Sequence, residues 1–196
     1  MNFLAHLYLS GSEQSIMIGN FIADSVKGKE MYTYSSAIQK GIQLHRFIDQ
    51  FTDSHPVIHD AKNIIAPYFG KYNAVVVDIY MDHFLAKDWS HYSSVNLEIF
   101  SLNVYGLLQR ELSILPQRVQ ELLPYMIRQD WLSNYANFEG IEQVFRGMSK
   151  RASFESHMEE ATIILQKHYT EMQQCFDVFF PELVRASNMQ LKVLSE

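Results

Sequence analysis

The chain has 196 residues, a formal net charge of −6, eight glycines, five prolines and one cysteine. An acidic chain lacks the basic footprint of a nucleic-acid-binding protein, so we expect no DNA or RNA partner. One cysteine excludes an intramolecular disulfide and a cysteine-based zinc site. The length and the 47% hydrophobic share fit one globular domain, and the scarcity of glycine and proline favours helices with short connections.

The first segment, NFLAHLYL at residues 2–9, is apolar and fits either a short helix or a strand. His6 lies among its leucines, and a lone histidine in such a setting is more often a core residue than a ligand. The segment has no basic region before its apolar run, so it does not resemble a signal peptide. No apolar run reaches the roughly 20 residues of a transmembrane helix. We therefore expect a cytoplasmic protein without membrane contact.

A helix is predicted from Ser12, as its N-cap, to about residue 26, with Gly28 ending it. Gly19 lies inside this helix, where glycine costs about 1 kcal/mol relative to alanine. It indicates a close approach of another backbone or of a ligand. Asp24 lies near the predicted C-terminus, where the helix dipole disfavours a negative charge. This placement favours a compensating cation beside Asp24.

The next predicted helix spans about residues 34–52 and contains GIQLHRFIDQFTD. His45, Asp49 and Asp53 recur every four residues and therefore share one face. Arg46 is offset by one position and within reach of Asp49. Two interpretations stay open. The face is either an exposed set of ion pairs, each worth roughly 0.2–0.5 kcal/mol, or part of a polar site.

Two further helices are predicted at 57–69, started by Pro56, and at 74–88, with Asn73 as N-cap. The second helix is apolar throughout, yet Asp78 and Asp82 lie one turn apart on its buried face, and His83 follows. Buried carboxylates cost several kcal/mol unless they are paired or bind a metal. Pairing with arginines and metal binding both remain possible explanations of this pattern.

The second half of the chain looks like structural support. Its predicted helices lie at about 95–113, 117–132, 139–148 and 153–179, with a short last helix after Pro181. An apolar stripe in the longest of them is typical of a core-facing helix. We therefore expect one all-α domain over residues 1–196, with the active-site region in residues 1–90 and supporting helices in 91–196.

The unusually placed histidines and aspartates come from four helical segments of the first half. They are His6, Asp24, His45, Asp49, Asp78, Asp82 and His83. Such a set suits a divalent cation such as Mn²⁺, Fe²⁺, Mg²⁺ or Zn²⁺. A metal held this way polarises a phosphoryl oxygen and lowers the pKa of a bound water, so hydrolysis of a phosphoester is the expected reaction class. The chain contains no P-loop, no G-x-G-x-x-G and no H-E-x-x-H motif.

Five motifs together resemble the acyl carrier protein phosphodiesterase family. They are MNFLAHLYLS at 1–10, GNFIAD at 19–24, LHRFID at 44–49, the aspartate pair of VVVDIYMDHFLAKDW at 75–89, and GM at 147–148. The resemblance implies an all-helical variant of the HD-domain phosphohydrolases. It also implies removal of 4′-phosphopantetheine from holo-acyl carrier protein, with Mn²⁺ as the favoured metal. The contiguous His-Asp dipeptide of ordinary HD enzymes occurs at 59–60, on a predicted exposed turn, and we regard it as coincidental.

The resemblance also assigns a metal site and catalytic roles. Asp24 matches the metal-binding aspartate of the family, and His6, His45 and Asp82 match motif positions with ligand chemistry. The catalytic assignments are hypotheses based on side-chain chemistry. Asp49 and Asp78 are further ligands or orient the histidines, Arg46 binds the substrate phosphate, and His83 donates a proton to the leaving seryl oxygen.

Acyl carrier proteins are strongly acidic, so an acidic enzyme needs a local basic surface to meet one. Five cations lie near the candidate site in sequence, either as a docking rim or as scattered solubilising charges. They are Lys27, Lys29, Lys40, Arg46 and Lys62. Two alternative functions remain open at this point. One is an HD-like phosphohydrolase that acts on a nucleotide or another small phosphodiester, and the other is a non-catalytic helical binding module.

Overall fold

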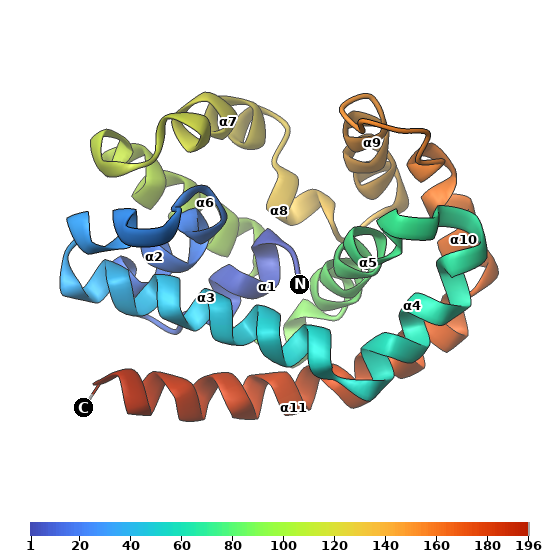
Figure 1. The fold of residues 1–196 in the computed structure, drawn as a ribbon, viewed down its shortest axis with the longest axis horizontal. Helices are drawn as coiled ribbons and strands as arrows, with labels where there is room; N and C mark the ends of the chain where they lie inside the picture. The colour runs from blue at the N-terminus through green and yellow to red at the C-terminus, as the bar shows by residue number, and fades with distance from the viewer. Residues whose placement is uncertain (196) are drawn as a thin grey trace.

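The computed structural model describes residues 1–195, and every regular element in that range is a helix. The prediction of an all-α chain is confirmed. Figure 1 shows the long α11 lying alongside α3 and α4. None of the described helices combines the length and apolarity needed to cross a lipid bilayer.

The α-helices are α1 (Phe3–Tyr8), α2 (Gln14–Ile22), α3 (Ser36–Ser54), α4 (Pro56–Phe69), α5 (Asn73–Lys87), α6 (Leu97–Arg110), α7 (Gln117–Arg128), α8 (Trp131–Asn134), α9 (Phe138–Ser149), α10 (Ala161–Lys167) and α11 (Tyr169–Ser195). Short 3-10 helices occur between them. These are η1 (Ala23–Ser25), η2 (Gly28–Thr33), η3 (Gly70–Tyr72), η4 (Trp89–His91), η5 (Leu112–Ile114) and η6 (Met158–Glu160).

Helix α5 is buried on nearly all sides, as its apolar sequence predicts, and it packs against α1, α4 and α11. Burial of each large apolar side chain contributes about 1.5–3 kcal/mol, so α5 contributes strongly to the core. Its fully buried apolar side chains are Val76, Val77, Ile79, Tyr80, Met81, Phe84 and Leu85.

Helix α1 is anchored to α5 through Asp82. One carboxylate oxygen of Asp82 accepts a hydrogen bond from the Asn2 N–H (3.2 Å), and the other accepts one from the Leu4 N–H (2.8 Å). The Asn2 side chain caps the helix by accepting from the Phe3 N–H (2.8 Å). These bonds satisfy N–H groups that have no partner within the helix. Residues 2–9, which fitted a helix or a strand, thus form a helix in a fixed position.

Helices α2 and α3 cross in close contact at two glycines. A Cβ added at Gly19 would collide with the main-chain carbonyl of Ile38, and one added at Gly41 would collide with that of Ile16. The close approach predicted from Gly19 is confirmed, and its partner is a second backbone. The crossing brings the C-terminal end of α2 against the middle of α3.

The helix predicted from Ser12 to about residue 26 is shorter in the structure. Ser12 lies in a turn, and α2 ends at Ile22. The chain then tightens into η1, in which the Val26 N–H donates to the Ala23 carbonyl. The predicted cap at Ser12 and the predicted end near Gly28 are therefore wrong, because the last turn is a separate 3-10 helix.

Two other predicted boundaries differ as well. Asn73 is the first residue of α5 and not its N-cap, because η3 leads directly into the helix. The helix predicted over 117–132 ends at Arg128. Asp130 adopts a left-handed conformation (φ 41°) and begins the separate α8.

The helix predicted over 153–179 is divided in the structure among η6, α10 and the first part of α11. His157 is left-handed (φ 52°) just before η6, and α11 begins at Tyr169 after a break that follows α10. Pro181 does not start a short last helix but lies inside α11. A proline inside a helix costs about 3 kcal/mol, and burial of the large side chains around it offsets this cost. These side chains are Phe176, Phe179, Phe180 and Leu183.

Candidate metal centre

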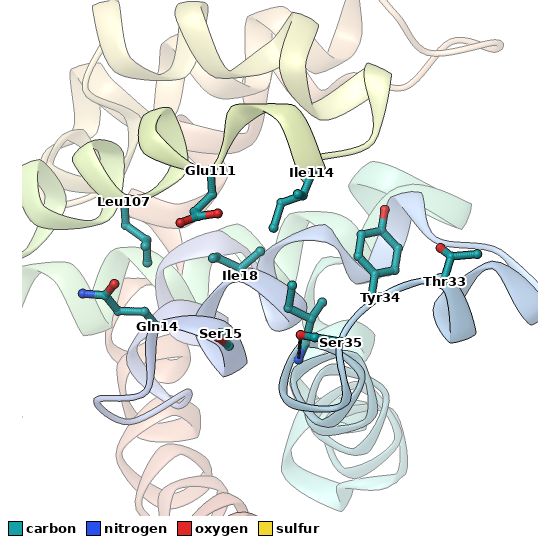
Figure 2. A pocket seen from close by; sticks show the side chains of 10 residues that line it. Gln14, Ser15, Ile18, Thr33, Tyr34, Ser35, Leu107, Glu111 and Ile114 are labelled. Atoms are coloured by element: carbon teal, nitrogen blue, oxygen red, sulfur yellow. Dashed lines mark hydrogen bonds between the residues drawn. The ribbon is translucent and has the colours of Figure 1, made fainter.

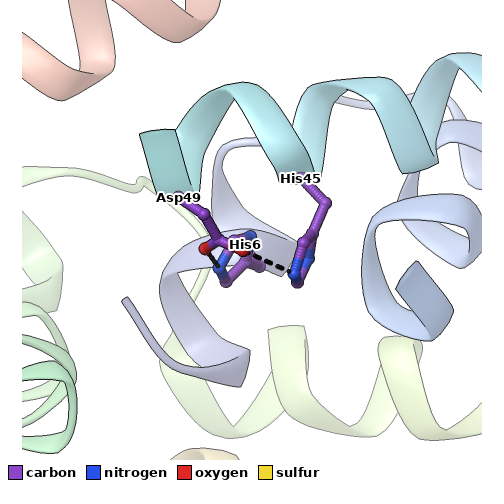
Figure 3. Close-up of side chains that lie close together, drawn as sticks. All are labelled: His6, His45 and Asp49. Carbon is purple, nitrogen blue, oxygen red and sulfur yellow. Dashed lines mark ion pairs between the residues drawn. The ribbon is translucent and has the colours of Figure 1, made fainter. Parts of the chain in front are cut away.

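Two histidines and an aspartate meet between α1 and α3 (Figure 3). His6 projects from α1, while His45 and Asp49 lie one turn apart on α3 and share a face. One ligand atom from each residue lies within 4.8 Å of the others. The two imidazole rings stack with their centroids 4.0 Å apart, and both histidines are buried, at 3% and 6% exposure.

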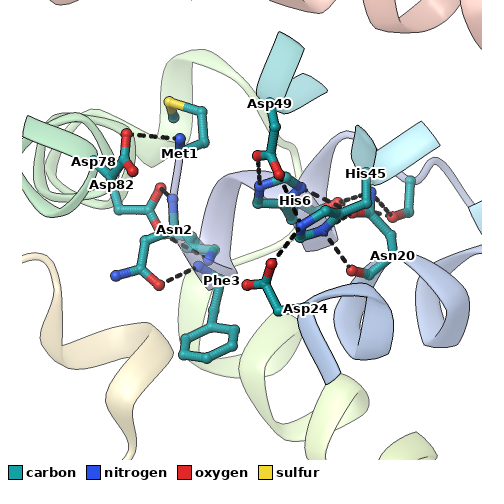
Figure 4. A network of polar contacts seen from close by, with 12 residues as sticks. Met1, Asn2, Phe3, His6, Asn20, Asp24, His45, Asp49, Asp78 and Asp82 are labelled. Atoms are coloured by element: carbon teal, nitrogen blue, oxygen red, sulfur yellow. Dashed lines mark hydrogen bonds and ion pairs between the residues drawn. The ribbon is translucent and has the colours of Figure 1, made fainter. Parts of the chain in front are cut away.

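Asn20, fully buried on α2, contacts both imidazoles on their Nδ1 side (Figure 4). Its Oδ1 lies 2.8 Å from His6 Nδ1, and its main-chain carbonyl oxygen lies 2.8 Å from His45 Nδ1. Its side-chain amide donates to the His6 carbonyl (2.8 Å) and to Ser10 Oγ (2.9 Å). The Nε2 atoms of both rings therefore remain available on the other side.

Two carboxylates face those Nε2 atoms. Asp49 bridges the rings, with one oxygen 3.2 Å from His6 Nε2 and the other 3.1 Å from His45 Nε2. Asp24, from η1, places an oxygen 3.2 Å from His45 Nε2. The Asp24 side chain is 80% exposed, so this side of the group is open to solvent, whereas the two imidazoles are not.

The electrostatics of the group favour a positive charge on His45 and a neutral His6. Burial alone would lower the pKa of His45, but its hydrogen bonds to Asp24 and Asp49 raise it to about 9. Burial works to raise the pKa of Asp49, but the imidazoles of His45 and His6 beside its two oxygens outweigh it and hold that pKa well below its usual range. The pKa of Asp24 is lowered, chiefly by its hydrogen bond to His45. Both carboxylates are therefore anionic at neutral pH. Burial lowers the pKa of His6, so its imidazole favours the neutral form.

The arrangement fits a divalent metal ion. His6 Nε2 is buried without a properly aligned hydrogen-bond partner, although it is close to Asp49. Two imidazole nitrogens and two carboxylates are a donor set that suits Mn²⁺, Fe²⁺ or Zn²⁺. A histidine that binds a metal usually donates its other ring N–H to an oxygen acceptor, and Asn20 supplies such acceptors to both rings.

The structure does not bring Asp82 and Asp78 to this group. Asp82 is fully buried, and both of its oxygens accept main-chain N–H groups at the start of α1. Asp78 accepts a hydrogen bond from the amino group of Met1 (2.9 Å). The carboxylates expected to bind metal or orient histidines are thus occupied by main-chain donors, because α1 docks its N-terminus against this face of α5.

His83 is also separate from the group. Its Nδ1 donates to the Tyr135 carbonyl (2.8 Å), and its Nε2 lies 3.2 Å from the Tyr169 hydroxyl. Its ring stacks on Phe138, so its neighbours come from the second half of the chain. The predicted role of His83 as proton donor has no support in this geometry, because both ring nitrogens are engaged elsewhere.

Four of the five predicted cations, including the half-buried Lys40 of α3, are free of ion pairs within residues 1–195. Lys27 and Lys29 are exposed on the segment that follows Asp24, and Arg46 is exposed on α3 next to His45. Lys62 is different, because it pairs with Asp53 at 2.9 Å. The unpaired cations therefore lie on α3 or on the segment that directly follows η1.

A groove of about 570 Å³ lies between α2, the start of α3 and the C-terminal end of α6 (Figure 2). Its lining is aliphatic and neutral polar, with Glu111 as the one charged side chain. A phosphate group needs cations or directed N–H donors, so the groove lacks the chemistry for phosphate. None of the predicted site residues lines it.

Asn20 is the residue of the site to which the sequence assigned no role. Asn20 is a polar residue between Gly19 and Phe21 in an apolar run, and His6 is likewise a polar residue in an apolar segment. A buried amide is stabilised by hydrogen bonds alone, whereas a buried charge needs an ion pair or a metal. The sequence pattern around Asn20 therefore did not indicate a functional site.

The chain was also compared with known proteins. The model of the family described as "Acyl carrier protein phosphodiesterase" matches residues 1–183. A relative of that name from Photorhabdus laumondii is 31% identical over 198 residues, covering 100% of both chains. One from Enterobacter sp. (strain 638) is 32% identical over 97% of this chain and 100% of its own, and one from Yersinia pestis is 30% identical over 94% and 96%. No solved structure matches, so the HD-like fold stays a prediction. The chain belongs to the acyl carrier protein phosphodiesterase family.

Proposed function

We propose that this chain is a metal-dependent phosphodiesterase that removes 4′-phosphopantetheine from holo-acyl carrier protein. The products are apo-acyl carrier protein and free phosphopantetheine. The observation that carries the proposal is the convergence of His6, His45 and Asp49 with the exposed Asp24, in a member of this family. This group combines buried nitrogen donors with a carboxylate that reaches solvent.

The residues that would hold the metal are His6, His45, Asp49 and Asp24. Mn²⁺ is the expected ion, with Mg²⁺, Fe²⁺ or Zn²⁺ as alternatives. When bound, such an ion polarises phosphoryl oxygens and lowers the pKa of water. Asp82 and Asp78 are left out of the ligand set because both oxygens of Asp82 accept main-chain N–H groups and Oδ1 of Asp78 is paired with the amino group of Met1.

The side chains of the protein position the substrate. Arg46 follows His45 on α3 and is exposed, so its guanidinium is available to a phosphodiester at the Asp24 side of the site. Among the described residues its Nη1 donates to the Met31 sulfur (3.3 Å), a weak acceptor that a phosphate oxygen readily replaces. Asp49, held by two histidines, keeps the ring spacing fixed while the substrate binds and leaves.

The carrier protein would approach along the segment from Asp24 to η2. Lys27 and Lys29 are exposed there without ion-pair partners in the described residues. Unpaired cations beside the open edge of the site attract an acidic protein despite the net negative charge of the chain. Their position directs the modified serine of the partner towards Asp24.

Replacement of Asp24 by alanine tests the proposal. We expect conversion of holo- to apo-carrier protein, followed by mass spectrometry, to be abolished while the helical circular dichroism signal is unchanged. Asp60→Ala removes an exposed aspartate of α4 and serves as the matched control with normal turnover. Full activity of Asp24→Ala with metal bound would end the assignment. Turnover of a nucleotide panel in place of holo-carrier protein would indicate a different substrate class.

A further inference from the structure

We propose that Asn20 is a positioning residue that fixes both imidazoles of the site in the tautomer with hydrogen on Nδ1. The Nε2 lone pairs are then directed at the position between the carboxylates. The inference rests on the proposed function only for its effect on metal binding, because the tautomers are a property of the metal-free protein.

The orientation of the Asn20 amide follows from its neighbours. One side-chain atom lies 2.8 Å from the His6 main-chain carbonyl oxygen, which can only accept a hydrogen bond. That atom must therefore be the NH₂ group, and its second hydrogen points to Ser10 Oγ at 2.9 Å. The remaining atom is the amide oxygen, so the amide offers an acceptor to the histidines.

The tautomer of each histidine follows next. His6 Nδ1 lies 2.8 Å from Asn20 Oδ1 and must carry a hydrogen to bond with it. His45 Nδ1 lies 2.8 Å from the Asn20 main-chain oxygen and 3.1 Å from Oδ1, and it must carry a hydrogen as well. The Nε2 atoms of the neutral rings thus hold lone pairs that face Asp49. Lone pairs and a carboxylate at this distance require a cation or a proton between them.

The two histidines depend on Asn20 in different ways. His45 bonds to the main-chain oxygen, which any residue at position 20 supplies. His6 has the side-chain oxygen as its acceptor. Removal of the side chain should therefore release His6 and leave His45 in place. General damage to the fold would disturb both rings alike, so this asymmetry separates positioning from a merely structural role.

The experiment is ¹⁵N–¹H NMR of the histidine rings in metal-free protein at pH 10, where both rings are neutral. The wild type should show Nδ1–H on His6 and His45. Asn20→Ala should give a tautomer mixture at His6 with His45 unchanged. Thr52→Val, another buried polar residue on α3, is the control that should change neither ring.

Metal affinity is the second readout. Mn²⁺ titration of Asn20→Ala should show binding weakened by about 10–100-fold, the usual loss for a group that orients a ligand. Nε2–H at His6 in the wild type would overturn the inference without any variant. Equal changes at His6 and His45 in Asn20→Ala would also overturn it. Correct tautomers with no Mn²⁺ binding would leave the inference intact and contradict the proposed function.

Discussion

Asp49 joins two histidines from different helices, with one carboxylate oxygen 3.2 Å from His6 Nε2 and the other 3.1 Å from His45 Nε2. This single side chain connects α1 to α3 at the point where their rings stack. Contact with Asp49 fixes the spacing between the two imidazole rings, which neither helix sets alone.

Asp49→Asn keeps the shape of this bridge and removes its charge. An amide presents one oxygen and one NH₂ group in place of two anionic oxygens, so it binds a cation less well. We expect Mn²⁺ affinity to fall by on the order of 10–100-fold and turnover of holo-carrier protein to fall with it. Asp53→Asn, one turn further along α3, should behave like the wild type, since the ion-pair partner of Asp53 within residues 1–195 is Lys62. Similar losses in both variants would contradict the assigned role.

The glycine crossing can be tested by adding one methyl group. In Gly41→Ala the new Cβ would collide with the Ile16 carbonyl, so α2 and α3 must separate. We expect urea denaturation to show a loss of more than about 2 kcal/mol and metal binding to weaken, because Asn20 moves away from the histidines. Gly106→Ala is the matched control, since its Cβ would meet only the Arg110 side chain at 3.5 Å. That variant should be neutral or more stable by up to about 1 kcal/mol.

Asp82 should make stability depend on pH. Burial raises its pKa to about 7, although the nearby amino group and the two N–H donors favour the charged form. The unfolded value is about 3.9, so the folded state holds the proton more tightly. The contribution of Asp82 is fully present below about pH 4 and is lost as the pH rises through about 7.

Asp82→Asn isolates this effect, because an amide does not titrate. Between pH 5 and pH 8 the unfolding free energy of the wild type should fall by roughly 2–3 kcal/mol more than that of Asp82→Asn. Urea denaturation at the two pH values measures the difference. Parallel pH profiles of the two proteins would show that Asp82 stays charged throughout.

Charge reversal tests the proposed docking segment. Lys27→Glu combined with Lys29→Glu should raise KM for holo-carrier protein about tenfold or more and leave kcat nearly unchanged, because encounter depends on long-range attraction. The increase in KM should be smaller at high salt, because salt screens the attraction between exposed charges. The same charge change at two exposed lysines elsewhere, Lys150→Glu with Lys192→Glu, is the control. An unchanged KM would remove Lys27 and Lys29 from the docking surface.

The sequence predicted the fold class and the presence of a polar group among helices, because apolar periodicity and misplaced polar residues are local signals. It could not tell which aspartates would meet the histidines. Asp49 and Asp82 both follow an apolar helical pattern, and only the docking of α1 decides that one faces His6 and the other the main-chain N–H groups of α1.

The helix boundaries that differ have a similar cause. Pro181 is a strong local signal for a helix start, yet packing of its neighbours carries α11 through it. Asn20 shows the reverse case, since its importance lies in contacts with residues from two other helices. Local pattern identifies unusual residues, and tertiary packing assigns their partners.

The exposed position of Asp24 on a 3-10 turn has a kinetic consequence. Three of the four proposed ligands are carried by α-helices, while the exposed Asp24 can swing away from His45 without disturbing the core. We therefore expect a metal ion held by these residues to exchange in the native state. A chelator should strip it far faster than the protein unfolds, and a different divalent ion should replace it on the same timescale.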